Sequence, residues 1–402
     1  MRSAFMSAAI AVGAAAASFH AAAQEPTPYI TSRERLTILS ANDGQSHLRL
    51  NARMQRDTEN VTRDSITVVH LGPDHPPIVK TVYGTVPNTI GGAPYMAMSG
   101  DGRWGFVSSR GGGSSAGEPE NLVSVIDLAS DELEVVQRIE APSPAMALMH
   151  PDGERLIIPC SSGLRVYRRI DGAWTMVLEH RTDFSLGSID ITRAGDRIVA
   201  AGRGGLHVFS YLGDGISYLA EATVAEGVPR FRGSSSQRFT PDGRRALVRI
   251  GGGQGTKGVL DDLLVIDMTL DPPTATQFVP QVGDGVESLA IHPSGRFAAL
   301  GMLEETRIDA HLTYSHLTII DLVNDPPRLL YQIAIEAIPE GIEFSPDGTQ
   351  FFVGLTAANH IAVFDVEGMI LKKHPMVIRV GHAPASMAIG RRYEREPATR
   401  RR

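Results

Sequence analysis

The sequence contains one cysteine, no excess of positive charge and, beyond its first 23 residues, no hydrophobic run long enough to span a membrane. The single cysteine, Cys160, excludes an internal disulfide framework and a four-cysteine zinc site. Its apolar neighbours predict a buried, inert thiol. The formal net charge of −7 argues against broad nucleic-acid binding. The chain also lacks a Cys-x-x-Cys-His sequence and the fingerprints of flavin and nicotinamide sites, so no cofactor is evident.

The N-terminus has the three-part pattern of a secretory signal peptide. Met1 and Arg2 are followed by an apolar, alanine-rich run over residues 4–19, and Ala21, Ala22 and Ala23 form a small-residue cleavage pattern. The apolar run is shorter than the ~20 residues that a membrane-spanning helix needs. We therefore predict that residues 1–23 are cleaved, that residues 24–34 form an N-terminal arm, and that the protein is periplasmic or secreted.

A tight-turn signature recurs along the rest of the chain. Six copies end in Gly102, Gly153, Gly195, Gly243, Gly295 and Gly348, with spacings of 51, 42, 48, 52 and 53 residues. Most copies resemble Pro-Asp-Gly, in which proline fixes φ, aspartate bonds the backbone and glycine adopts a positive φ. A regular period of this length is typical of stacked supersecondary units.

Each turn is surrounded by short apolar or alternating segments, and none of the intervening sequence has sustained helical periodicity. Four antiparallel strands in a unit of ~50 residues describe one blade of a β-propeller. Six turns account for six blades. Residues 384–389 supply one more first strand, and residues 35–41, 65–71 and 78–86 supply its three missing partners. The sequence thus predicts an all-β, seven-bladed propeller over residues 35–390, with its last blade shared between the two termini.

The repeat resembles the YVTN and lactonase-type seven-bladed propellers of bacteria. Residues 144–153 and 339–348 carry the pattern Pro-x-x-φ-φ-φ-x-Pro-Asp-Gly, where φ is an apolar residue except at Glu343. The resemblance covers nearly all of the chain after residue 23. It implies a fold that carries lactone hydrolases, cycloisomerases, large subunits of amine dehydrogenases and binding proteins without chemistry. The pairs His150-Pro151 and His292-Pro293 are similar to a lactonase-type turn, and their place at the strand exit favours a structural role.

Long connections are expected on one face of the ring, opposite the short turns. They cover residues 42–64, 111–121, 251–261 and 304–314. Long loops gathered on one face are a usual sign of a binding surface, and tolerated insertion is the alternative.

Alignment of the first strands on the turn glycine places two carboxylates, Glu287 and Glu340, eight residues before it in neighbouring blades. Together with His382 they are the candidate catalytic residues, because paired carboxylates and an imidazole suit general acid–base work or a calcium or magnesium ion. Salt bridges between blades are the alternative explanation. The candidate ligand-binding residues near the same channel mouth are Arg230, Arg232, Arg238 and Asp284.

Three charged residues stand five positions before the turn glycine, deeper in the predicted channel. They are Asp190, Arg238 and Glu343, and structural pairing is the favoured interpretation. His311, His316 and Asp309 form a weak candidate for a metal site, since their spacing matches no established motif. Residues 251–258 fail the phosphate-loop pattern and are interpreted as a loop. Residues 391–402 form a basic tail that is expected to be solvated.

Three functions fit these features. The first is a periplasmic propeller that binds a small polar or anionic ligand, or a protein partner, at the loop-rich channel face. The second is a lactonase-like hydrolase, isomerase or lyase that uses the channel carboxylates. The third is the large subunit of a redox complex similar to an amine dehydrogenase. No membrane-spanning segment and no nucleic-acid partner are expected, and the sequence leaves the oligomeric state open.

Overall fold

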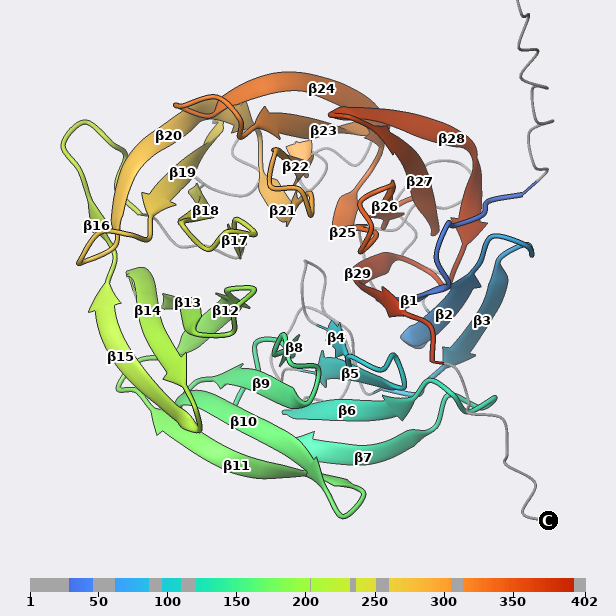
Figure 1. Cartoon of the computed structure of the whole chain (residues 1–402). Coiled ribbons are helices and arrows are strands. Elements are labelled where there is room, and N and C mark those ends of the chain that lie inside the picture. The colour runs from blue at the N-terminus through green and yellow to red at the C-terminus, as the bar shows by residue number, and fades with distance from the viewer. Residues whose placement is uncertain are drawn as a thin grey trace, which may run out of the picture.

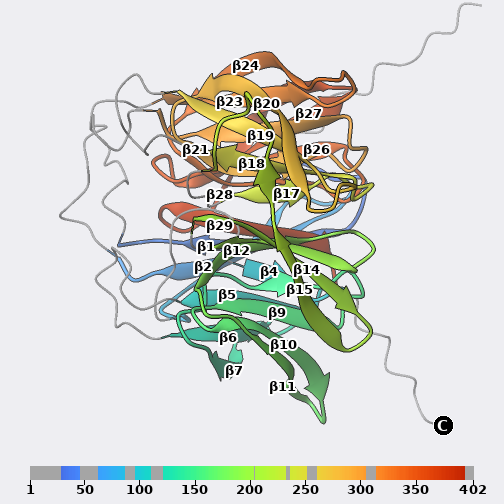
Figure 2. The same cartoon turned by 90° about the vertical axis from the view of Figure 1, so that its left-hand side faces the viewer.

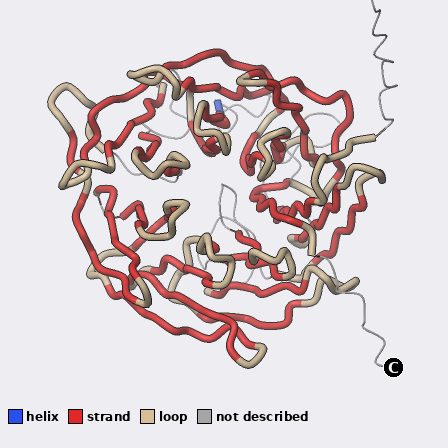
Figure 3. Tube along the Cα trace, viewed as in Figure 1, coloured by secondary structure: helices blue, strands red, loops and turns tan. Residues whose placement is uncertain are grey.

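The computed structural model describes residues 29–45, 62–86, 96–109, 121–202, 204–231, 236–250, 260–304 and 314–393. The described elements are β-strands, β1 to β29, arranged in seven sheets around a central axis (Figure 1). Strands make up the ring and tight turns connect them (Figure 3). The predicted all-β, seven-bladed propeller is confirmed.

The first four blades follow in chain order, each written from the innermost strand outwards. Blade 1 consists of β4 (Met96–Met98), β5 (Trp104–Ser109), β6 (Leu122–Asp127) and β7 (Val135–Glu140). Blade 2 consists of β8 (Leu148–Met149), β9 (Arg155–Cys160), β10 (Gly163–Ile170) and β11 (Ala173–Arg181). Blade 3 consists of β12 (Leu186–Ile191), β13 (Arg197–Gly202), β14 (Gly205–Leu212) and β15 (Gly215–Glu221). Blade 4 consists of β17 (Gln237–Phe239), β18 (Arg245–Ile250), β19 (Asp261–Asp267) and β20 (Thr274–Gly283). A short fifth strand, β16 (Thr223–Val224), pairs in parallel with β20.

The remaining three blades complete the ring. Blade 5 consists of β21 (Val286–Ile291), β22 (Phe297–Met302), β23 (Tyr314–Asp321) and β24 (Arg328–Glu336). Blade 6 consists of β25 (Pro339–Phe344), β26 (Gln350–Leu355), β27 (His360–Glu367) and β28 (Ile370–Arg379). Blade 7 consists of β29 (Pro384–Arg391), β1 (Leu36–Asn42), β2 (Ser65–Leu71) and β3 (Ile78–Tyr83).

Blade 7 joins the two ends of the chain, as predicted. Strand β29 pairs antiparallel with β1, with Leu36 opposite Arg391 and Ile38 opposite Ile389. In Figure 1 the red β29 lies directly beside the blue β1, β2 and β3. This pairing closes the ring and covers the inner edge of β1.

The hydrophobic core is divided among the seven spaces between neighbouring blades. The cluster between blades 1 and 2, for example, packs Phe106 edge-on against Trp174 with ring centroids 4.8 Å apart. Because both faces of a blade are covered by its neighbours, strands such as β1 and β5 are buried along their whole length. The outermost strands have one solvated edge and alternate, as β7 does. Figure 2 shows the ring edge-on.

The six turn glycines all adopt a positive φ, between +68° at Gly243 and +78° at Gly195. Each donates its N–H to the carbonyl three residues earlier, for example from Gly348 to Ser345 at 2.8 Å. A side chain at that earlier position is bonded within the turn in most copies, as the Ser345 hydroxyl is to Asp347 at 2.6 Å. The positive φ of glycine and the side-chain bonds within the turn, both predicted from the Pro-Asp-Gly signature, are therefore present.

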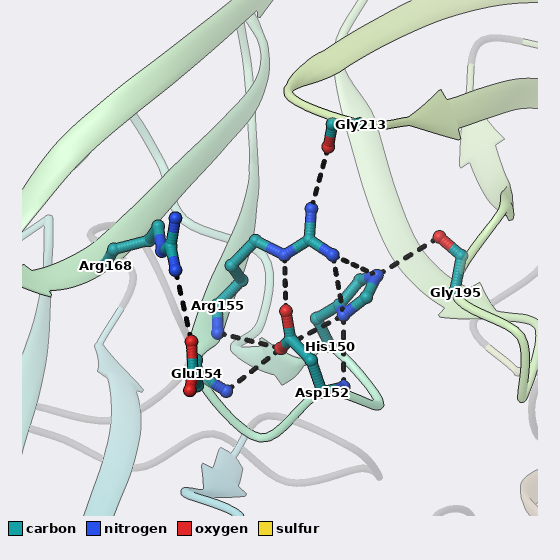
Figure 4. Close-up of polar contacts among 7 residues, drawn as sticks. All are labelled: His150, Asp152, Glu154, Arg155, Arg168, Gly195 and Gly213. Atoms are coloured by element: carbon teal, nitrogen blue, oxygen red, sulfur yellow. Dashed lines mark hydrogen bonds and ion pairs between the residues drawn. The ribbon is translucent and has the colours of Figure 1, made fainter.

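The two His-Pro turns link neighbouring blades. His150 Nε2 donates to the carbonyl of Gly195 in blade 3 at 3.1 Å, and His292 Nε2 donates to the carbonyl of Gly348 in blade 6 at 2.9 Å. In each imidazole, Nδ1 accepts the backbone N–H of the residue two positions later in the chain, so Nε2 carries the proton and is the donor. Figure 4 shows the first link. These histidines have the structural role that their position favours.

A second kind of link starts two residues after the turn glycine. Arg155 donates to the Gly213 carbonyl at 3.0 Å (Figure 4), and three other side chains reach carbonyls beyond their own blade in the same way. These are Arg197 to Met268 at 2.6 Å, Arg245 to Leu322 at 3.1 Å and Gln350 to Thr31 at 2.8 Å. The last bond, together with buried Ile30, attaches the described part of the N-terminal arm to blade 6.

Candidate functional site

The central channel has two different ends. The short turns join first strands to second strands, whereas the long connections join second strands to third strands. Antiparallel pairing therefore puts the turns on one face, the turn face, and the long connections on the other, the loop face. Most residues of the four long connections, including the glycine-rich stretch 251–258, lie outside the described residues. Their role in binding stays a prediction.

The candidate catalytic carboxylates lie near the loop-face ends of two adjacent inner strands. Glu287 belongs to β21 and Glu340 to β25, and these strands are joined by a bond from the Ser288 hydroxyl to the Pro339 carbonyl at 3.2 Å. Glu287 is 4% exposed and Glu340 is 1% exposed. Both are engaged in contacts within the protein. Neither side chain presents appreciable surface to a ligand in this conformation.

Irregular pairing of β21 and β25 with their neighbours explains why the directions of the Glu287 and Glu340 side chains do not follow from the sequence pattern. The register between β21 and β22 shifts between Val286 and Ser288, and that between β25 and β26 shifts between Pro339 and Ile342. Each glutamate falls within such a shift, where simple alternation of side chains fails. Gly341 allows β29 to approach β25 closely, because a Cβ atom at this position would lie 3.0 Å from the Met387 backbone nitrogen.

Two further candidates lie at the same face, in the segments that lead into inner strands. Asp284 precedes β21, is 5% exposed and uses its carbonyl to accept the Glu304 N–H at 3.0 Å. His382 precedes β29, and its Nδ1 lies 3.1 Å from the Thr62 hydroxyl. With Glu287 and Glu340, these residues occupy the three consecutive blades 5, 6 and 7.

Of the two candidate arginines upstream of β17, Arg230 belongs to the described residues. Arg230 is exposed, and the described residues show no bond between it and the rim carboxylates. Arg232 lies outside the described residues. Their assignment as ligand-binding residues is untested.

Three charged side chains from three different blades meet in the channel itself. Arg238 of β17 and Glu343 of β25 approach to 3.8 Å between Nη2 and Oε1, although blade 5 lies between their blades. The Asp190 carboxylate of β12 accepts the Phe239 N–H at 2.7 Å. Arg238 retains 16% of its side-chain exposure and Glu343 retains 34%. These are the residues predicted to pair, and they form the accessible charged group of the channel.

The surroundings of this trio raise the pKa of both carboxyl groups. Enclosure by protein raises the pKa of Glu343 to about 7, the charge of Asp190 adds to the effect, and Arg238 opposes it. Burial also raises the pKa of Asp190, while Arg238 and two backbone N–H bonds favour its ionised form. The two backbone donors thus oppose the effect of burial at Asp190, whereas at Glu343 the opposing group is Arg238.

The weak metal candidate lies only in part within the described residues. His316 Nδ1 lies 2.9 Å from Glu304 Oε1, whereas His311 and Asp309 lie outside them. The part of the chain that the structure describes holds no group of three or more potential metal-ligating side chains. In the same part, no helix is long and apolar enough to cross a membrane.

Comparison with family models finds no match, and comparison with curated protein sequences finds none either. Solved structures do resemble the chain. A periplasmic gluconolactonase from Pseudomonas aeruginosa has a TM-score of 0.61 at 15% identity, over 89% of this chain and 99% of the other. A candidate 6-phosphogluconolactonase from Bacteroides fragilis has a TM-score of 0.60 at 15% identity, over 90% and 99%.

A third structure, hydrazine synthase from Kuenenia stuttgartiensis, has a TM-score of 0.57 at 14% identity, over 76% of this chain and 92% of the other. At such identities the likeness shows the fold alone. The resemblance to lactonase-type propellers is thus supported at the level of the fold, and membership of the YVTN family stays a prediction.

Proposed function

We propose that this protein is an exported propeller that binds a small polar ligand in its central channel, with access from the loop face. The observation that carries the proposal is the meeting of Asp190, Arg238 and Glu343 in the channel. Charges withdrawn from water are costly unless they are paired or used. Here the Arg238–Glu343 contact is long and both partners remain accessible, which favours a group that a ligand can reach.

The test is a thermal-shift screen of the chain from residue 24 against sugar lactones, carboxylates, polyols, calcium and magnesium. We expect at least one polar compound to raise the melting temperature. Arg238→Met should abolish that response. Arg168→Met is the matched control, because Arg168 forms an exposed ion pair with Glu154 on the outer part of blade 2. Responses that are equal in both variants would contradict the proposal.

A lactonase-like hydrolase is the alternative. A carboxyl group with a pKa near neutrality, as at Glu343, can exchange protons at physiological pH. The likeness to a gluconolactonase makes sugar lactones the first substrates to assay. Glu287, Glu340 and His382 remain the residues predicted to act in catalysis. Loss of lactone hydrolysis in Glu287→Gln and Glu340→Gln, with unchanged folding, would support this alternative.

The third function, a large subunit of a redox complex, predicts a stoichiometric smaller partner. Purification of the protein from its natural host at low salt tests this directly. Export is tested by N-terminal sequencing of the purified protein, which we expect to begin at Gln24 if the signal peptide is removed.

A further inference from the structure

The Arg238–Glu343 contact spans a blade. In blade 5, the position that matches Arg238 and Glu343 is Ala290. Ala290 is 3% exposed and packs in the hydrophobic cluster between blades 5 and 6, so blade 5 contributes no charged side chain at this level.

The contact leaves bonding capacity on both partners. At 3.8 Å the Arg238 Nη2 and Glu343 Oε1 atoms are farther apart than a hydrogen bond allows. Within the described ranges, the hydrogen bond that the Arg238 side chain donates runs from Nη1 to the Gln237 carbonyl at 3.1 Å. The Nη2 group and the Glu343 carboxyl therefore lie close together, and both side chains are partly exposed.

Asp190 has a different role. Its Oδ2 atom accepts the Phe239 N–H at 2.7 Å, and the Ile191 N–H also bonds it. These fixed donors favour its ionised form and oppose the burial that raises its pKa. The negative charge close to Glu343 favours the neutral form of Glu343, which then has an O–H to donate.

We propose that Arg238 and neutral Glu343 form a two-donor site for one carboxylate of a small ligand at mid-channel. This inference rests on the proposed function and specifies its ligand class. A guanidinium and a carboxylic acid that donate to one anion make short, charge-assisted hydrogen bonds. No covalent step is involved. The complex needs a proton on Glu343, which the site takes up from solvent when the anion binds above pH 7.

The charged groups on the strands packed against β25 do not act on Glu343 in place of Asp190 and Arg238. Among the described residues, Asp190 and Arg238 are the charges that act on Glu343. The others are placed or bonded elsewhere: Glu287 at the loop face, His316 with Glu304, Asp321 with Asn324, and Arg391 exposed where β29 ends.

A carboxylate fits this site better than a cation. A cation would meet the positive charge of Arg238, and it would have to compete with the backbone donors that already engage Asp190. Acetate and methylammonium are a matched pair of probes, because they are similar in size and opposite in charge.

The experiment measures acetate affinity between pH 6 and 9 in the whole chain from residue 24. Glutamate labelled with ¹³C at Cδ reports the Glu343 signal, which the Glu343→Gln variant identifies. We expect acetate to raise the pKa of Glu343 above its value in the free protein. The dissociation constant should increase about tenfold per pH unit above the pKa of Glu343 in the free protein. The pH dependence of acetate affinity in the wild type tests by itself whether acetate binding is coupled to protonation of Glu343, even if a variant fails to fold.

Three variants separate the roles. Glu343→Gln keeps a permanent donor of the same shape, so acetate should still bind and its affinity should become independent of pH. Asp190→Asn removes the charge that favours the neutral acid, so affinity should be lost at a lower pH. Arg238→Met should lose acetate binding.

The outcomes are distinct. Acetate affinity that does not change from pH 6 to 9 in the wild type, or methylammonium binding that strengthens above pH 7, would overturn the two-donor site. If a polar compound binds and loses its response in Arg238→Met, but acetate does not bind or its affinity does not change with pH, the proposed function stands and this inference fails. If no compound, acetate included, binds at any pH, both fail.

Discussion

His150 Nε2 lies 3.1 Å from the carbonyl oxygen of Gly195, so a side chain of one blade caps the turn of the next. The same residue pair is sterically exacting. A Cβ atom at position 195 would lie 2.3 Å from His150 Nε2, and Gly195 has a φ of +78°. This contact requires the His150 imidazole and also requires a residue without a side chain at position 195.

Gly195→Ala should therefore cost more than a substitution at a glycine with free space around it. Gly213 is the control, because it has a φ of +59° and a Cβ atom there would have no other atom within 4 Å among the described residues. We expect Gly213→Ala to lower the free energy of unfolding by about 1 kcal/mol, and Gly195→Ala by about 3 kcal/mol. Urea unfolding measures both. Equal costs would contradict the packing described here.

Removal of the imidazole should relieve that clash. His150→Ala alone leaves the Gly195 carbonyl without its donor and should cost about 1–2 kcal/mol. The double variant His150→Ala/Gly195→Ala should lose less unfolding free energy than the sum of the losses in the two single variants. Glu154→Gln is the control, since the exposed pair of Glu154 with Arg168 contributes at most about 1 kcal/mol. Strict additivity would show that the two positions do not interact.

Deletion of the closing strand should unfold the propeller. Strand β29 pairs with β1 along its length and packs beside β25 and β4. A chain that ends at residue 383 exposes the edge of β1 and the buried side chains of two inter-blade clusters. Circular dichroism should show loss of the cooperative melt. Truncation after Tyr393 keeps β29 and should melt like the full chain. A folded chain ending at residue 383 would contradict the role of blade 7 as a closure.

Glu343 should make stability depend on pH. Its pKa rises from 4.5 to about 7 on folding, so between these values the folded state holds a proton that the unfolded state has lost. The wild type therefore loses stability as pH rises through this window, and the loss is complete above pH 7. The Glu343→Gln variant lacks this pH-dependent loss of stability. The difference between its melting temperature and that of the wild type should therefore grow in favour of the variant from pH 4.5 to 7, and stay constant above pH 7. A difference that shrinks over that window would contradict the assignment.

Cys160 should resist thiol reagents in the folded protein. It is fully buried, and burial raises its pKa to about 11, so the thiolate fraction at pH 8 is on the order of one in a thousand. An Ellman assay should give almost no colour until denaturant is added. Rapid reaction in buffer would contradict the burial of this side chain.

Much of the architecture could be predicted because its determinants are local. Proline, aspartate and glycine in the turns act within four residues, and a turn chemistry repeated six times marks each blade. Residues 35–41, 65–71 and 78–86 were predicted to complete the blade that residues 384–389 begin, because six turns account for six blades and leave these segments without partners. The short parallel strand β16 was not expected, because two residues carry no periodic signal.

The candidate site was predicted less completely. Alignment on the turn glycine correctly brought Asp190, Arg238 and Glu343 to one level of the channel. It also singled out Glu287 and Glu340 as the groups to act on a ligand, and both prove to be almost fully buried. Bulges in β21 and β25 break the alternation on which a prediction of direction depends.

The strands, the turns, the number of blades and the shared seventh blade could be predicted from residue pattern alone, because each depends on short-range pattern and on pairing that repeats. Which charged groups are accessible, and which of them meet, became clear from the three-dimensional structure. Arg238 and Glu343 belong to blades that are not neighbours, and their contact depends on the distance across the ring between those blades. Distances across a closed ring arise from the packing of all seven blades, and no local segment encodes them.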